Sequence, residues 1–421
     1  MRHIFLLIRK TVFLLLLVGI LFSYAMFQGG FVSWFLFYSV TPLVLYVLIL
    51  LFYPFSKWKV ERSISNHILR SGDALIAEVK LTRKIPFPLF YCVVEEMLPK
   101  SLEKKNLGIE MYKYMGQPKA VYEPRSIKRV LFPGFKRSFS FRYGIEGLPR
   151  GEHHLQAIRV KMGDIFGFVK KEHYFEVYDA ILVYPKFRKL SMNEKAHSFE
   201  EGVAPSYNIN LKDTTVVSGV REYAPGDRVS WIDWKTTARK NSVMTKEFEK
   251  QKSFDMLYIL DATSHSANDE IVFEGAVELS ASLLDALRKQ TSELAFMTIG
   301  KQRTYFPIQR DVSKQDKINQ HLAKLTPSGN VPFGQAIIDA QRSLPSGLIT
   351  LLATSNLSRE TKETIGKLRF KSSKIVLFYI QAKDRISEEQ HQLLAELRSS
   401  GVIVNLMTED KFLKQTFEVS T

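Results

Sequence analysis

Two long apolar stretches open the chain, and each is long enough to cross a lipid bilayer. Thr11–Phe27 and Phe31–Phe55 contain no charged residue, and the short turn Gln28-Gly29-Gly30 separates them. At about 1.5 Å per helical residue, the shorter stretch reaches roughly 26 Å, and flanking residues extend it to the thickness of the hydrocarbon core. Because lipid offers the backbone no hydrogen bonds, we expect a transmembrane helical hairpin within residues 1–60, with spans at about 11–27 and 31–55.

Cations lie before the first stretch and after the second, and none lies in the turn between them. Those before the first span are Arg2, Arg9 and Lys10, and those after the second are Lys57, Lys59 and Arg62. This bias predicts a two-span protein of the cell membrane with both termini in the cytoplasm, and we expect the aromatic residues Trp34, Tyr53 and Trp58 at the interfaces. A cleaved signal peptide is the competing interpretation. The chain lacks an A-x-A-like cleavage site, and a second span follows at once.

From residue 61 to 189, apolar and polar residues alternate in short runs that turn signals separate. This pattern predicts a β-sandwich-like domain with antiparallel strands. The predicted strands are Ala74–Leu81, Phe90–Met97, Ser138–Tyr143, Leu155–Val160 and Ala180–Tyr184. Cys92 lies inside one of them, where a small buried residue is the expected role.

The final part, residues 253–421, alternates apolar strands with amphipathic helices. The predicted strands are Met256–Leu260, Leu294–Ile299, Leu348–Ala353, Ile375–Ile380 and Val402–Leu406. The predicted helices are Ile271–Arg288, Ser313–Leu325, Phe333–Leu344, Ser358–Leu368 and Ser387–Ser399. Such alternation indicates an α/β doubly wound domain with a mostly parallel sheet covered on both faces.

Between these domains, residues 190–252 form a connector and an unusual segment, Ser218–Lys252. The segment holds two of the four tryptophans, Trp231 and Trp234, among interleaved cations and acids. One interpretation is structural, with partly buried ion pairs among Arg221, Asp233, Lys235 and Arg239. Another is a docking face for a protein partner, anchored by tryptophan and arginine. A nucleic-acid surface is the third, although the interleaved acids would repel phosphate.

Composition narrows these alternatives. The 421 residues carry a formal net charge of +16. The chain has a single cysteine, and this excludes an internal disulfide framework and cysteine-rich zinc sites. The first sixty residues contain five cations and no acid. Further basic runs, Lys128-Arg129, Lys136-Arg137 and Lys186–Lys189, would face anionic headgroups if the β-domain lies close to a bilayer. The positive charge is therefore better explained by a membrane surface than by nucleic acid.

Several motifs resemble those of a bacterial family, the domain of unknown function 58 family. The signature residues are Arg221, Glu222, Tyr223, Gly226, Asp227, Asp233, Trp234, Lys235 and Arg239, and upstream motifs include Gly151-Glu152-His153 and Asp164-Ile165-Phe166-Gly167. The resemblance implies a membrane-anchored protein that ends in a von Willebrand factor type A-like domain. It also implies partners, because members are often encoded beside MoxR-type AAA+ ATPases and transglutaminase-like membrane proteins.

The resemblance further implies where a metal site would lie. Type A domains with a metal place Asp-x-Ser-x-Ser after their first strand, and the matching residues here are Asp261, Thr263 and His265. An imidazole is a poor ligand for Mg²⁺, which prefers hard oxygen donors. Val331 stands near the position of the expected threonine, and Ala353–Asn356 contains no aspartate. We therefore expect no metal and no cofactor.

Enzyme signatures are missing from the sequence, including GxxxxGK[ST], HExxH and GxSxG. We expect a membrane-anchored, cytoplasmic-facing adaptor without enzymatic activity, which works with a MoxR-type ATPase in assembly or remodelling of envelope proteins. The alternatives are an enzyme that uses the crevice at Asp261, or a module that binds lipid or nucleic acid.

Overall fold

The computed structural model divides the chain into two compact units. The first comprises Met1–Asn106 and Tyr122–Val183, and the second comprises Leu107–Val121 and Tyr184–Thr421. The residues that the structure describes are 2–104, 107–193, 214–224, 227, 229–240, 242–251, 256–263, 269–290, 294–307, 312–329, 331–341 and 347–420.

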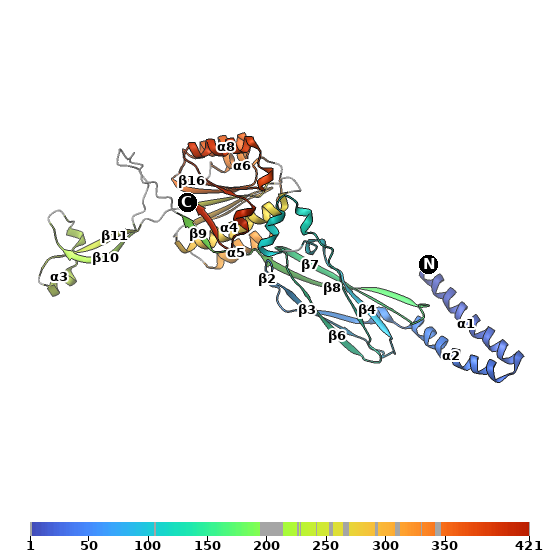
Figure 1. Cartoon of the computed structure of the whole chain (residues 1–421). Helices are drawn as coiled ribbons and strands as arrows, with labels where there is room; N and C mark the ends of the chain where they lie inside the picture. The colour runs from blue at the N-terminus through green and yellow to red at the C-terminus, as the bar shows by residue number, and fades with distance from the viewer. Residues whose placement is uncertain are drawn as a thin grey trace. The chain divides into compact units, whose positions relative to one another are not determined.

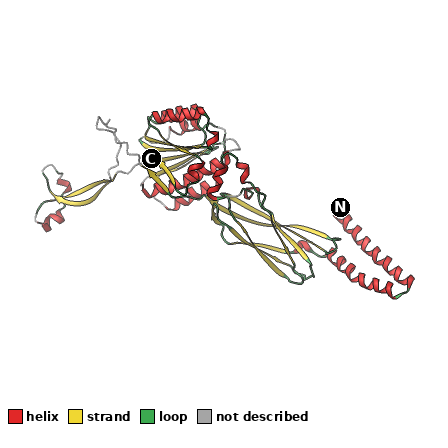
Figure 2. Cartoon of the chain, viewed as in Figure 1, coloured by secondary structure: helices red, strands yellow, loops and turns green. Residues whose placement is uncertain are grey.

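The first unit begins with two apolar helices, α1 (Arg2–Gln28) and α2 (Phe31–Phe52) (Figure 2). They pack side by side around a turn in which Gly29 adopts φ +61°, a conformation that favours glycine. Both are long and apolar enough to span a membrane, over Ile8–Gln28 and Phe31–Phe52. The two apolar stretches therefore form the predicted helices, and the second ends three residues before its predicted limit at Phe55.

Two antiparallel sheets follow in the first unit (Figure 1). The strands are β1 (Lys59–Ile64), β2 (Ile68–Arg70), β3 (Leu75–Thr82), β4 (Tyr91–Glu96), β5 (Ile127–Leu131), β6 (Ser138–Ile145), β7 (Gly151–Gly163) and β8 (Lys170–Tyr184). One sheet has the order β1-β3-β6 and the other β2-β8-β7-β4-β5. Alternate residues of β3 and β4 are buried in one shared core, so period-two patterning produces the two-sheet arrangement. Cys92 is buried, as predicted.

The core of the two sheets continues into the helices. Val44, Val47, Leu50 and Leu51 of α2 belong to the same buried cluster as the strand residues. Tyr53 and Trp58, predicted at a membrane interface, are 5% and 6% exposed and pack edge to face against each other. Their rings therefore pack within the protein, where the chain after α2 turns directly into the core.

Arg62, which follows the second predicted span, is buried in the protein. The sequence pattern counts it among the cations that flank the second span, but its side chain is fully buried in the first unit. Its guanidinium donates to Glu96 at 2.6 Å and to Asp179 at 2.9 Å, and Tyr143 donates a further hydrogen bond to Glu96. Buried charges must be paired, so this arginine is committed to the fold and not to lipid headgroups.

The second unit contains the predicted α/β sheet, in the order β14-β13-β12-β15-β16-β17. Its strands are β12 (Met256–Asp261), β13 (Leu294–Ile299), β14 (Arg303–Phe306), β15 (Leu348–Thr354), β16 (Ser372–Ile380) and β17 (Ile403–Met407), and all pairs are parallel except β13 with β14. The helices are α4 (Glu270–Gln290), α5 (Val312–Lys324), α6 (Phe333–Gln341), α7 (Arg359–Leu368), α8 (Glu388–Ser399) and α9 (Glu409–Phe412). Successive residues of β12 enter opposite cores, so both faces of the sheet are covered.

A short segment inside the predicted β-domain belongs to the second unit. Leu107–Val121 contains two 3-10 helices, Gly108–Tyr114 and Pro118–Val121, whose apolar residues enter the core beside α4. The predicted domain boundaries of 61–189 and 253–421 therefore need correction here. The physical reason is burial, since Tyr112 and Met115 are 1% and 0% exposed.

The connector also contains strands that the sequence pattern does not predict. β9 (Leu190–Asn193) pairs in parallel with the last strand, β18 (Phe417–Ser420). β10 (Thr214–Glu222) and β11 (Met244–Gln251) form an antiparallel pair, and α3 (Trp234–Lys240) lies between them in sequence (Figure 1). We call residues 214–251 the signature hairpin.

Candidate functional site

Asp261 lies at the carboxyl end of β12, the strand whose neighbours β13 and β15 lie on either side of it in the sheet. Its Oδ1 accepts hydrogen bonds from the Thr263 amide at 3.0 Å and the Thr263 hydroxyl at 2.7 Å. Its Oδ2 accepts one from the Thr354 hydroxyl at 2.6 Å, which comes from the end of β15. All three residues are buried. The strand order brings them together, because carboxyl ends of parallel strands meet at one edge.

The oxygen ligands that Asp261, Thr263 and Thr354 offer do not fit a divalent cation well. It offers one carboxylate, and both of its oxygens already accept hydrogen bonds from threonine. Among the described residues, no group of three or more histidine, cysteine, aspartate or glutamate side chains could hold a metal ion. His265, the third position of the expected pattern, lies outside the described residues. The arrangement is that of a hydrogen-bonded strand terminus.

We therefore expect no tight binding of Mg²⁺ or Mn²⁺ when either is titrated into the full chain in detergent. A metal would have to compete with three hydrogen bonds that the protein already makes to Asp261, and it prefers several oxygen ligands. Isothermal titration calorimetry measures this directly. A tight site that disappears in the Asp261→Asn variant would contradict the expectation.

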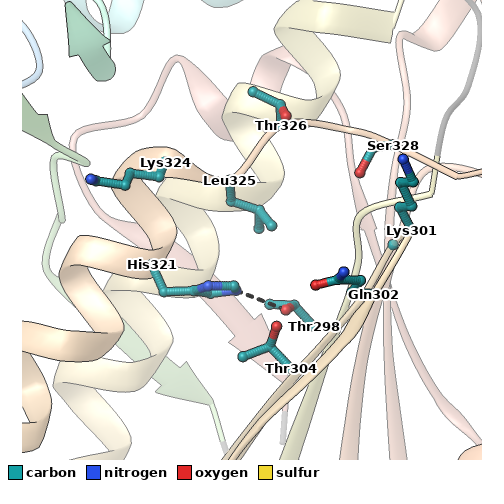
Figure 3. A pocket seen from close by; sticks show the side chains of 10 residues that line it. Thr298, Lys301, Gln302, Thr304, His321, Lys324, Leu325, Thr326 and Ser328 are labelled. Atoms are coloured by element: carbon teal, nitrogen blue, oxygen red, sulfur yellow. Dashed lines mark hydrogen bonds between the residues drawn. The ribbon is translucent and has the colours of Figure 1, made fainter.

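A polar pocket of about 300 Å³ lies near the end of β13 (Figure 3). Its lining residues are Thr298, Gly300, Lys301, Gln302, Thr304, His321, Lys324, Leu325, Thr326 and Ser328. Figure 3 shows His321 reaching from α5 toward Thr298, whose Oγ1 lies 2.8 Å from His321 Nε2. Burial lowers the pKa of His321, so the imidazole is neutral near pH 7.

Backbone contacts join this pocket to the loop that follows Asp261. The Ala262 amide donates to Ile299 O at 2.6 Å, and the Ser328 amide donates to Ala262 O at 2.8 Å. Glycine is required at this point, because a Cβ on Gly300 would lie 2.9 Å from Ala262 O. The lining contributes hydroxyls and two lysines without a carboxylate, so it suits a small polar or anionic group and offers no pair of acids for general acid–base catalysis.

The signature residues lie on the signature hairpin, apart from Gly226, which lies outside the described residues. Arg221 makes a two-pronged ion pair with Asp227, at 2.8 and 2.7 Å, and this pair lowers the pKa of Asp227. Asp233 Oδ1 accepts a hydrogen bond from the Thr236 amide at the start of α3. The predicted ion pairs among Arg221, Asp233, Lys235 and Arg239 stay a prediction beside these local contacts.

Apolar and aromatic side chains of the signature hairpin are exposed. Trp234 and Val229 are each 67% exposed, and Tyr223 is 39% exposed. The polar signature residues Glu222, Lys235 and Arg239 are exposed as well. Exposed aromatic and arginine side chains on one element are typical of protein-binding surfaces.

One cluster escapes sequence analysis altogether. Arg188, predicted to face lipid headgroups within the run Lys186–Lys189, is 8% exposed and pairs with Glu278 of α4 at 2.6 Å. Tyr112 donates a hydrogen bond to the same carboxylate, and the Arg188 guanidinium lies 4.1 Å from the centre of the Phe417 ring. No pattern in the sequence distinguishes this arginine from its exposed neighbours.

Comparison with known proteins identifies the family. A family model described as a protein of unknown function, DUF58, matches residues 219–385. The uncharacterized protein YeaD of Bacillus subtilis (strain 168) is 39% identical over 314 residues, which cover 75% of this chain and 74% of YeaD. The chain belongs to the DUF58 family. The resemblance that the signature residues predict is thereby confirmed, and the DUF58 match begins within the signature hairpin.

Solved structures add little to this family assignment. The PilB minor pilin from Streptococcus sanguinis is 7% identical, with 77% of this DUF58 chain and 85% of the pilin covered and a TM-score of 0.30. The CARDB domain of the PF1109 protein from Pyrococcus furiosus is 10% identical, and the match covers 30% of this chain and 92% of the CARDB domain with a TM-score of 0.19. Scores this low carry no inference about shared fold.

Proposed function

We propose that this DUF58 protein is a membrane-anchored adaptor whose signature hairpin binds a protein partner. In this proposal α1 and α2 cross the cell membrane and both termini are cytoplasmic. The partner suggested by the family resemblance is a MoxR-type AAA+ ATPase, which would act with the adaptor on envelope proteins. The adaptor itself would carry out no chemistry.

The observation that carries the proposal is the exposure of Trp234 on a structured element. The side chain is 67% exposed, although tryptophan usually buries most of its surface. The backbone beneath it is fixed, because Asp233 bonds the first turn of α3 and Thr237 Oγ1 accepts a hydrogen bond from the Met244 amide. A rigid support for an exposed aromatic residue favours recognition of a partner over packing within the chain.

The α/β sheet supports the type A-like part of the resemblance. Its first strand lies inside the sheet, the next two strands extend to one side, and the edge strand β14 is antiparallel. Asp261 at the end of that first strand is the position where the resemblance expects a metal ligand. We propose a type A-like domain in which threonine contacts to Asp261 take the place of a metal.

Trp234→Ala and Arg221→Ala should each reduce capture of the partner by about 30-fold, the effect of removing a binding hot spot worth about 2 kcal/mol. Trp234 would be the apolar anchor, and Arg221 the charged one. The measurement is crosslinking from native membranes, followed by mass-spectrometric identification and quantification of AAA+ ATPase peptides.

Tyr178→Ala is the matched control, because Tyr178 is 70% exposed but lies on β8, outside the signature hairpin. The Tyr178→Ala variant should capture as much of the partner as the natural chain does. Recovery of no AAA+ ATPase, or equal capture by the Trp234→Ala and Tyr178→Ala variants, would contradict the proposal.

A further inference from the structure

A cleft of about 350 Å³ lies between α1 and the loop that joins β7 to β8, within the first unit. Its walls are of two kinds. Cationic side chains line one part and apolar residues the rest: Arg9, Lys10, Phe13, Leu14, Phe168 and Val169. A cleft that combines two cations with an apolar wall matches an amphiphile that has an anionic head and a hydrocarbon tail.

The cations of this cleft have hydrogen-bonding capacity left for a ligand. Lys10 Nζ donates one hydrogen bond, to Phe168 O at 2.9 Å, and an ammonium group has three donors. Arg9 and Lys10 belong to a stretch of sixty residues without a single acid. The carboxylate of the loop itself, Asp164, is 1% exposed and accepts hydrogen bonds from the amides of Phe166, Phe168 and Val169. It is therefore committed to holding the loop.

The order of residues along α1 follows the polarity of a phospholipid. Arg9 and Lys10 lie at the start of the apolar helix Ile8–Gln28, and Phe13 lies about one turn, or roughly 4.5 Å, further along. If α1 spans the membrane, the cations lie at headgroup level and Phe13 lies where the hydrocarbon begins.

A second observation supports lipid contact at this end of the first unit. Three loops there expose large apolar side chains, Ile85, Phe90, Phe132, Phe135, Ile165 and Phe166, each at least 48% exposed. Tyr46 OH donates to Pro88 O and Tyr53 OH donates to Ile85 O, so the first loop is bonded to α2. A β-bridge between Leu89 and Gly134 joins it to the second loop, and Lys10 of α1 donates to Phe168 O of the third. Tyr46 lies six residues before the end of α2, about 9 Å along its axis. An apolar rim beside two spanning helices fits a bilayer interface.

We propose that this cleft binds one anionic phospholipid, with its phosphate on Arg9 and Lys10 and an acyl chain along Phe13, Leu14 and Phe168. The site rests on the proposed membrane anchor. It goes beyond the adaptor function, because it makes the first unit selective for the lipid around it.

The test is native mass spectrometry of the full chain in detergent, with dioleoyl phosphatidylglycerol and dioleoyl phosphatidylcholine added in competition. We expect one phosphatidylglycerol to bind in preference. Arg9→Gln should weaken that binding about fivefold, the effect of one cation near an anionic headgroup. Phe168→Ser should weaken it as well, whereas Lys57→Gln removes a cation outside the cleft and should leave it unchanged.

Equal binding of the two lipids, or an equal effect of Arg9→Gln and Lys57→Gln, would overturn the site. Displacement of the lipid by millimolar inorganic phosphate would also overturn it, since the cleft would then recognise a small anion and not a lipid. Alkaline extraction of membranes tests the anchor separately. A chain that is extracted refutes the anchor, whereas a chain that stays in the membrane but shows no lipid preference refutes only the site.

Discussion

Replacing Arg188 by methionine should lower the free energy of unfolding of the second unit by about 3–5 kcal/mol, because it leaves a largely buried carboxylate without its cation. The Glu278 side chain is 14% exposed and holds Arg188 Nε at 2.6 Å. The same guanidinium donates to the carbonyls of Phe412 and Lys414, both at 2.7 Å. Methionine keeps much of the apolar contact and removes every one of these hydrogen bonds.

Pulse proteolysis of the full chain in increasing urea measures this loss. Lys189→Met is the matched control, because Lys189 is the exposed neighbour in the same basic run, and it should change stability by less than about 0.5 kcal/mol. Arg188→Lys should fall between the two, since an ammonium cannot make the guanidinium's fork of hydrogen bonds. Equal urea midpoints for Arg188→Met and Lys189→Met would contradict the assignment.

Arg188 also shows where sequence patterning stops being informative. The length of two uncharged apolar stretches predicts the helices α1 and α2. Periodicity and short apolar runs predict most strands and helices that follow, because burial leaves a regular trace in the sequence. A single arginine within the run Lys186-Phe187-Arg188-Lys189 leaves no such trace. Its burial depends on Tyr112, Glu278 and Phe412, which are far apart in the chain.

The same reasoning explains the missed elements. β9 is four residues long and pairs with β18, more than two hundred residues later, so its sequence carries no local signal. Strand β11 of the signature hairpin is rich in charged residues, and the alternation that predicts a half-buried strand is therefore absent from it. Within Leu107–Val121, the 3-10 helices have only seven and four residues, too few to show a period, although the segment joins the core of the second unit.

The sequence likewise predicts one residue of the candidate site and misses others. Asp261 at the end of an apolar strand is predictable, since ligand positions in doubly wound sheets lie at strand ends. Thr354 is not, because the family pattern directs attention to a missing aspartate in that loop, whereas the structure uses the threonine hydroxyl to bond Asp261. The exposure of Trp234 likewise requires a structure, since a tryptophan in sequence is most often a core residue.

Replacing Arg62 by methionine should destabilise the first unit by a similar amount, about 3–5 kcal/mol. The Arg62 and Glu96 side chains are both fully buried, and Arg62 also pairs with Asp179 and donates to Val177 O at 2.9 Å. Arg142→Met is the matched control, because Arg142 makes an exposed ion pair with Glu78, a kind of pair worth about 0–1 kcal/mol. Equal urea midpoints for the two variants would contradict the prediction.

The Arg62→Met deficit should also depend on pH, and Glu96 determines its sign. Burial raises the pKa of Glu96, and Arg62 and Tyr143 oppose that rise. Without Arg62 the pKa of Glu96 should rise further, so the ionised carboxylate destabilises the folded state at neutral pH and stops doing so once it binds a proton. The difference in stability between the natural chain and Arg62→Met should therefore shrink as pH falls from about 8 to about 5.

Arg142→Met should show no such change, because the carboxylate it leaves behind is exposed to solvent. A deficit that stays constant over this range would mean that Glu96 does not carry the buried charge.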